Sequence, residues 1–252
     1  MNTFIQQLKT LRRTILKYLV PELVWPWKVD FDGTPIPIRD MPFSFGIKRH
    51  LLNKSYEQHE RNIVHKMIHK GDSVLEMGGS LGILTFIIAN RISKDGTIVM
   101  IEASKENYDI ASSWLSEITN ITVRHGIAFP VWTANNSIVS KYEARNGSLG
   151  GMVHYTILDE GKQAQNTVAN ICIKDICELL AFRPQCLVID IEGAEDIILT
   201  LKPNYPEFIR TIIIELHPDI YGYEHQRNIL KVYEREGFHL ALKEENVYCF
   251  IR

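Results

Sequence analysis

The sequence predicts an α/β fold, a doubly wound and mostly parallel sheet closed by a C-terminal antiparallel hairpin. Three observations predict it. The 252 residues, 45% apolar and 23% charged, are enough for one large packed core. From Gly71 onward, short apolar strands alternate with helix-length segments, which is the rhythm of βαβ units. The last two strands lie close enough in the chain to pair as a hairpin.

The first 54 residues are expected to form an extension ahead of the main domain, which spans 55–252. Apolar residues recur at helical spacing from Phe4 to Leu19 until Pro21, and residues 1–28 carry a net charge of +4. This amphipathic helix either packs on the protein's own core or, with Trp25 and Trp27, makes a peripheral membrane contact through residues 4–27. The alternation and the Asp-Gly pair within Val29–Asp40 predict a short hairpin.

The main domain is expected to begin with a helix from Ser55 to about His69, because Ser55–Gln58 has the spacing of a capping box. The strands that follow are expected at Ser73–Met77, Thr97–Glu102, Ile121–His125, Cys186–Ile191, Arg210–Leu216, Phe238–Leu242 and Val247–Ile251. The helices between them are expected at Leu81–Arg91, Lys105–Glu117, Ala194–Leu201 and Glu224–Glu236. Residues 126–182 are too many for a simple crossover and predict added structure on the substrate side, with strands at Met152–Leu158 and Val168–Ile173.

Charge and cysteine usage exclude several classes of protein. The 28 basic and 30 acidic residues leave a net charge of -2, so no overall field attracts nucleic acid. The four cysteines lack the spacing and histidine partners of a zinc site and predict reduced core thiols. No apolar run is long enough to cross a bilayer, and charges interrupt the N-terminal segment where a signal core would lie. A cytoplasmic protein is expected.

A glycine-rich turn after the first parallel strand is the first candidate binding site. Glycines at 78, 79 and 82 let the backbone turn sharply and approach a ligand, with helix-start amides facing it. The dinucleotide signature Gly-x-Gly-x-x-Gly would require glycine where Ser80 stands, so the match fails. Glu76 would repel a pyrophosphate but suits an amino group. This charge pattern favours S-adenosylmethionine as cofactor; the alternative is a tight turn that binds no ligand.

A second acidic strand end supports a nucleoside site. Glu102 closes the next strand, twenty residues beyond Gly82, where a carboxylate can accept both ribose hydroxyls. Ile127 and Ala128 follow the strand after that and are candidates to lie against the adenine. Taken alone, Glu102 is equally compatible with a solvated strand end.

Two later strands become polar where they end, and their polar residues are the catalytic candidates. These are Asp190 and Glu192 after one strand and His217 after the next. Asp190 or His217 could take a proton from an acceptor, or Asp190 and Glu192 together could hold a divalent cation. The metal-free route is the one favoured here. Glu195 is interpreted as stabilising the start of the following helix.

Three segments together resemble the FkbM-type family of S-adenosylmethionine-dependent methyltransferases. They are residues 71–82, Asp190–Glu195 and Glu215–Pro218, and the pattern Tyr56-Glu57 with Glu60 is similar to the family's preceding helix. The resemblance implies a class I methyltransferase fold, a Rossmann-like arrangement. It also implies O-methylation of a hydroxyl on a sugar, glycolipid or natural product in a cytoplasmic enzyme. Glu76 and Ser80 stand where the family usually has Asp and Asn.

Two other functions stay open on the sequence alone. An NAD(P)-dependent oxidoreductase is disfavoured by Glu76 and Ser80. A non-catalytic methyltransferase-like protein would use its surface, or the basic N-terminal helix, to tether a partner or a membrane. The acceptor itself is not identified by any segment of the chain.

Overall fold

The computed structural model describes residues 25–132, 142–145, 154–157 and 170–252. The chain divides after Tyr56 into two compact units. The amphipathic helix expected near the start lies outside the described residues. Within the described part of the chain, no helix is long and apolar enough to cross a membrane. The four cysteines are buried, as expected for core thiols, and no disulfide joins them.

The first unit contains the predicted hairpin and a helix that was not predicted. Strands β1 (Lys28–Phe31) and β2 (Thr34–Pro37) pair antiparallel. Helix α3 (Phe45–Leu52) begins after Ser44, whose hydroxyl accepts a hydrogen bond from the backbone N–H of Ile47 at 3.3 Å. Serine is one of the residues preferred at this N-cap position.

The capping box expected at Ser55 is wrong. Helix α4 (Gln58–Met67) begins after Glu57, which has a left-handed backbone and makes no side-chain cap. The Ser55 hydroxyl pairs with His50 Nδ1 at 2.9 Å instead. A local contact to the preceding turn therefore replaces the cap that the spacing suggested.

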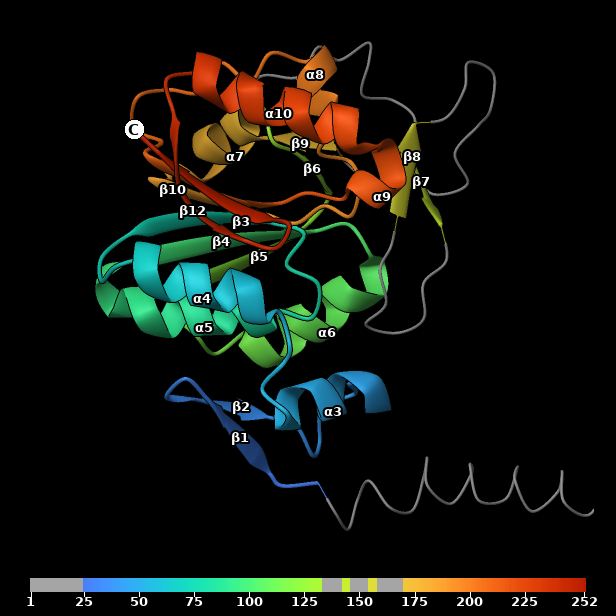
Figure 1. Cartoon of the computed structure of the whole chain (residues 1–252). Helices are drawn as coiled ribbons and strands as arrows, with labels where there is room; N and C mark the ends of the chain where they lie inside the picture. Colours follow the sequence, from blue (N-terminus) through green and yellow to red (C-terminus); the bar gives the residue numbers. More distant parts are fainter. Residues whose placement is uncertain (1–24, 133–141, 146–153, 158–169) are drawn as a thin grey trace, which may run out of the picture. The chain divides into compact units, whose positions relative to one another are not determined.

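The second unit is built on a seven-stranded sheet of order β12-β13-β11-β10-β3-β4-β5 (Figure 1). Its strands are β3 (Ser73–Met77), β4 (Thr97–Glu102), β5 (Ile121–His125), β10 (Cys186–Ile189), β11 (Thr211–Glu215), β12 (His239–Glu244) and β13 (Val247–Ile251). The pairs from β5 through β11 are parallel, whereas β13 runs antiparallel to both β11 and β12. The predicted α/β class and terminal hairpin are confirmed.

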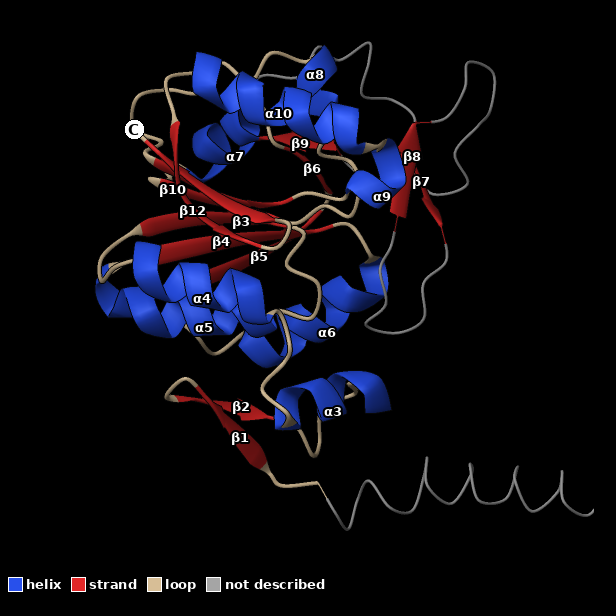
Figure 2. Ribbon diagram, viewed as in Figure 1, coloured by secondary structure: helices blue, strands red, loops and turns tan. Residues whose placement is uncertain are grey.

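Helices cover both faces of this sheet, as Figure 2 shows. One face carries α4, α5 (Ile83–Ile92) and α6 (Lys105–Leu115), with the short 3-10 turn η1 (Ser93–Asp95) following α5. The other carries α7 (Ile173–Leu180), α8 (Ile197–Thr200), α9 (Pro218–Tyr221) and α10 (Tyr223–Arg235). Strand side chains alternate between the two cores: Leu75 and Met77 pack with the second layer, whereas Val74 packs with the first.

The segment between β5 and β10 departs most from simple alternation. Strand β6 (Ile127–Phe129) pairs in parallel with β9 (Asn170–Cys172), and β7 (Tyr142–Arg145) pairs antiparallel with β8 (His154–Ile157). Helices α7 and α9 were not predicted. Helix α8 is shorter than expected and begins at Ile197, so the chain from Asp190 to Asp196 forms a loop above the end of β10.

Candidate active site

The site lies where the winding of the sheet reverses. Strands β3 and β10 are neighbours, but the chain continues from β3 to β4 on one side and from β10 to β11 on the other. In open α/β sheets, ligands bind at the carboxyl ends of the strands at such a switch point. A cleft is found there, and its lining includes five carboxylates, from Glu57, Glu60, Glu76, Asp190 and Glu215. None of its lining residues is basic.

The glycine turn after β3 is required by close backbone approach. Gly78 has φ +86°, and a Cβ built on it would lie 1.6 Å from the carbonyl oxygen of Asp190. Its N–H donates to the carbonyl of Ile101 at 2.9 Å. Gly79 is also close-packed, because a Cβ there would lie 2.5 Å from the side chain of Met100. Any side chain at Gly78 would push apart the ends of β3 and β10 that form the cleft.

The start of α5 is set by two further residues of the predicted loop. Gly82 has φ +77°, and a Cβ there would lie 2.6 Å from Leu115 on α6. Ser80 has φ +49°, a left-handed conformation that is uncommon for a residue with a side chain. The predicted loop thus combines close packing with an unusual backbone, which is frequent at ligand sites.

Glu76 is buried at the end of β3, with 2% of its surface exposed. Its Oε2 accepts a hydrogen bond from the Thr85 hydroxyl of α5 at 2.5 Å. Burial raises the pKa of Glu76 to about 7, against the hydrogen bond from Thr85, and the charge of Glu102 adds to the rise. A cationic ligand in the cleft would favour the ionised form.

Glu102 lies at the end of β4 and is hydrogen-bonded to the glycine turn that follows β3. Its carboxylate accepts hydrogen bonds from the backbone N–H groups of Ser80 at 2.8 Å and Ser104 at 2.6 Å. Burial raises its pKa to about 7 despite these bonds. The two adenine candidates, Ile127 and Ala128, are buried on β6. Neither they nor Ser80, Gly82 and Glu102 belong to the lining of the cleft itself.

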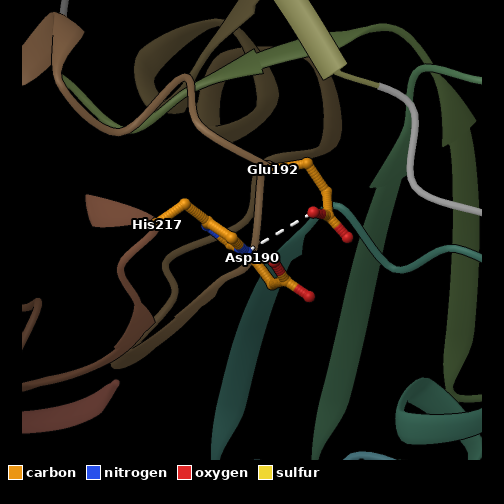
Figure 3. A group of neighbouring side chains, drawn as sticks. All are labelled: Asp190, Glu192 and His217. Carbon is orange, nitrogen blue, oxygen red and sulfur yellow. Dashed lines mark ion pairs between the residues drawn. The ribbon is translucent and has the colours of Figure 1, made fainter. Parts of the chain in front are cut away.

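The three catalytic candidates lie together at the other side of the switch point (Figure 3). His217 Nε2 is 3.7 Å from Asp190 Oδ1 and 3.4 Å from Glu192 Oε2. One ligand atom from each residue lies within 4.8 Å of the others. The loop after β10 and the end of β11 therefore bring into one cluster residues that are more than twenty positions apart in sequence.

Glu195 lies ahead of α8 and not in its first turn, where it was predicted. Its side chain supports the cluster instead. Its buried Oε1 accepts a hydrogen bond from Gly193 N–H at 3.1 Å and lies 3.1 Å from His217 Nδ1. Burial lowers the pKa of His217. The hydrogen bond and the charge of Glu195, together with the charges of Glu215 and Glu192, have the larger effect and raise this pKa to about 9. Burial also raises the pKa of Asp190 well above its ordinary value.

Three carboxylates of the cleft were not among the predicted site residues. Glu57 and Glu60 come from the start of α4, and Glu215 ends β11. Burial and the charge of Glu60 raise the pKa of Glu215 to about 8. Glu215 carries the same signal as Glu76 and Glu102, an acidic residue that ends an apolar strand. Glu57 directly precedes the first residue of α4 and Glu60 lies in its first turn, so both come from the start of that helix.

Comparisons with known proteins give similar folds at low identity. No family model matches the chain, and no curated protein sequence matches it. Fibrillarin from Aeropyrum pernix, solved with natively bound S-adenosyl-L-methionine, is 11% identical over 73% of this chain and 66% of that chain, with a TM-score of 0.44. This chain thus spans slightly under two thirds of the fibrillarin's length.

Two other solved structures compare in the same way. A putative rRNA methylase from Clostridium thermocellum is 12% identical over 78% of this chain and 94% of that chain, with a TM-score of 0.43. A ribosomal protein L11 methylase from Lactobacillus delbrueckii subsp. bulgaricus is 14% identical over 79% and 78%, with a TM-score of 0.41. At this level of similarity no activity is transferred to the chain, and its function is argued from its own site.

Proposed function

We propose that the chain is an S-adenosylmethionine-dependent methyltransferase that acts on a hydroxyl group. The observation that carries the proposal is the cleft at the switch point, whose lining offers five carboxylates and no basic side chain. A pyrophosphate would be repelled there, whereas a ligand with an ammonium and a sulfonium group would be attracted. An NAD(P)-dependent oxidoreductase is disfavoured for the same reason.

The residues present fit this cofactor in type and position. Glu76 and the carboxylates beside it suit its ammonium and sulfonium groups, and Gly78 and Gly79 keep the backbone close to the ligand. Glu102 suits a ribose hydroxyl, since its two oxygens offer about four lone-pair sites and the backbone bonds from Ser80, Ala103 and Ser104 use three of them. Ile127 and Ala128 are proposed for the adenine. When bound, the cofactor supplies a methyl group activated by a positively charged sulfur.

The protein's own contribution is to position an acceptor and take its proton. Holding two reactants in line can account for several kcal/mol of the barrier (about 7–11 at most). A base that takes the hydroxyl proton adds on the order of 10²–10⁴-fold. Asp190 or His217 is proposed for this task, because both belong to the polar cluster with Glu192 next to the cleft and Asp190 also lines the cleft.

The acceptor class is proposed from the FkbM-type resemblance. The segments Asp190–Glu195 and Glu215–Pro218 that carry the resemblance also supply Asp190, Glu192, His217 and the supporting Glu195. A sugar, glycolipid or natural-product hydroxyl is the acceptor that this family implies.

A screen with methyl-labelled cofactor tests the proposal. Sugar, lipid-linked and polyketide-like hydroxyl acceptors are incubated with the whole chain, and label in the product is counted. We expect transfer to at least one hydroxyl acceptor, with Asp190→Asn as the inactive control. Cofactor binding without transfer to any acceptor would favour the non-catalytic alternative, and binding of NAD(P) instead would contradict the proposal.

A further inference from the structure

We propose that Asp190, Glu192 and His217 form a binding site for a divalent cation. His217 Nε2 lies 3.7 Å from Asp190 Oδ1 and 3.4 Å from Glu192 Oε2. These separations are too long for good hydrogen bonds, which have donor and acceptor at about 2.7–3.2 Å. Two ligands bonded to one cation at about 2.1 Å lie roughly 3.0–3.5 Å apart. The His217–Glu192 separation falls within this range, and the His217–Asp190 separation is 0.2 Å beyond it, so a shared ion would require the three side chains to draw closer together.

Glu195 supplies the support that metal-binding histidines have. A ligating histidine usually gives its other ring N–H to a carboxylate or carbonyl, which fixes the tautomer and aims the ligating nitrogen. Glu195 Oε1 lies 3.1 Å from His217 Nδ1 and is itself held by the N–H of Gly193. The Glu195 side chain is fully buried. Nδ1 is thereby occupied, and Nε2 faces Asp190 and Glu192.

Asp190 supplies an independent indication of a missing ligand. Its Oδ1, one of the atoms that face His217, is buried and has no hydrogen-bond partner among the described residues. A buried carboxylate oxygen without a partner is costly, and such groups in native structures normally have an ion or a hydrogen-bond donor. A bound cation would supply that partner.

The backbone holds Glu192 in place at some cost. Glu192 has φ +51°, and Gly193, with φ +98°, continues the left-handed turn. A Cβ at Gly193 would lie 2.7 Å from the Ile220 side chain of α9, so glycine is needed there. Left-handed backbone at a residue with a side chain is unfavourable, and it persists where the surroundings enforce it, often at ligand sites. The result is a carboxylate aimed at His217.

The ligand set indicates the class of ion. Carboxylate oxygens suit Mg²⁺, Ca²⁺ and Mn²⁺, whereas an imidazole nitrogen suits Zn²⁺ and the other transition metals. Two carboxylates and one imidazole therefore favour a transition-metal dication such as Mn²⁺ or Zn²⁺. The inference does not require the cofactor assignment, since it rests on the geometry of the three side chains and Glu195.

Manganese binding to the whole chain tests the inference. After treatment with a chelator and its removal, the protein is titrated with Mn²⁺, and the loss of the free-ion paramagnetic resonance signal is measured. We expect one Mn²⁺ per chain, displaced by Zn²⁺. Glu192→Gln and His217→Ala should each weaken binding at least about tenfold, and Glu195→Gln about 10–100-fold by releasing His217.

Asp196→Asn is the matched control, because Asp196 lies on the same loop but pairs with His225 at 3.6 Å. It should bind Mn²⁺ like the unmodified chain. Glu192 is partly exposed, so Glu192→Gln decides the test if His217→Ala does not fold. Failure of the chain to bind either Mn²⁺ or Zn²⁺, or equal binding by Glu192→Gln and the unmodified chain, would overturn the inference. S-adenosylhomocysteine titration in the presence of chelator separates this result from a failure of the proposed function.

Discussion

The two sides of the switch point differ in how far their carboxylates are satisfied by the protein itself. On the β3–β4 side, Glu76 accepts from Thr85, and Glu102 accepts from Ser80 and Ser104. On the β10–β11 side, Asp190 Oδ1 and Glu195 Oε2 are buried without hydrogen bonds among the described residues. The carboxylates of the β3–β4 side, Glu76 and Glu102, already have hydrogen-bond donors, and we call this side the cradle. On the β10–β11 side, two buried carboxylate oxygens have no donor among the described residues.

From this difference we expect the β3–β4 side to bind the cofactor and the β10–β11 side to take part in the reaction. A cradle whose side chains are already held in place loses little entropy when a ligand arrives, which is the benefit of preorganisation. The opposite side keeps strong acceptors free to engage an ion, a hydroxyl or a proton. We expect substitutions on the β3–β4 side to affect stability and cofactor affinity, and substitutions on the β10–β11 side to affect turnover.

The largest effect is expected from Gly78→Ala, which would break the contact between the two sides. The added methyl group would overlap the Asp190 carbonyl, and φ +86° disfavours alanine as well. We expect a loss of about 3–5 kcal/mol in the free energy of unfolding and loss of S-adenosylhomocysteine binding, measured by denaturant unfolding and calorimetry. Gly71→Ala is the control, since Gly71 has φ +87° with nothing within 4 Å. It should cost only about 1–2 kcal/mol, and equal costs would refute the close-approach argument.

Asp190→Asn tests the second side alone. The amide keeps the shape of the side chain but is a poor base and a poor cation ligand. We expect turnover to fall by about 10²–10⁴-fold while S-adenosylhomocysteine affinity stays within a few fold. Initial rates and a binding titration on the same preparation measure the two quantities. Full activity would remove Asp190 from the catalytic residues.

Glu102→Ala tests the cradle. Removing a charged hydrogen-bond acceptor costs about 1.5–3 kcal/mol, so we expect cofactor affinity to fall by roughly 10–100-fold. Glu106→Ala is the control, because Glu106 is exposed on the first turn of α6. Calorimetric dissociation constants compare the two variants. An unchanged constant for Glu102→Ala would contradict the ribose assignment.

The smallest effect is expected in the pH dependence of the free energy of unfolding, to which Glu76 and Glu102 contribute. The pKa values of Glu76 and Glu102 are raised by burial from 4.5 to about 7 in the folded protein. Between these values the folded state holds more protons than the unfolded state, so the free energy of unfolding falls as pH rises and levels off above 7.

Glu76→Gln should remove its part of that slope, on the order of 1 kcal/mol per pH unit, in denaturant unfolding measured from pH 5 to 8. Binding of a cationic ligand favours the ionised carboxylates, so cofactor affinity should rise over the same interval. An unaltered slope in Glu76→Gln would show that burial at Glu76 is not the cause.

Local patterns in the sequence predicted most of the sheet. Ser73–Met77, Thr97–Glu102 and Ile121–His125 have the predicted bounds, because short apolar runs between turn residues are a local signal. The cluster of Asp190, Glu192 and His217 was also predictable, since parallel strands in one sheet end at the same edge.

The missed features depend on contacts between distant segments. Glu57 and Glu60 belong to the cleft only because α4 packs against the sheet next to β11. The role of Glu195 depends on a helix that begins at Ile197, two residues later, and on a histidine from another strand. The sequence around each of these residues is compatible with an ordinary helix start, so no local pattern distinguishes the two roles.

Titration of the whole chain with S-adenosylhomocysteine and, separately, with NAD⁺ tests the central claim most directly. We expect one S-adenosylhomocysteine bound per chain through its ammonium group and ribose, weakened in Glu102→Ala, and no measurable NAD⁺ binding at the acidic cleft. Binding of NAD⁺ with no binding of S-adenosylhomocysteine would contradict the account.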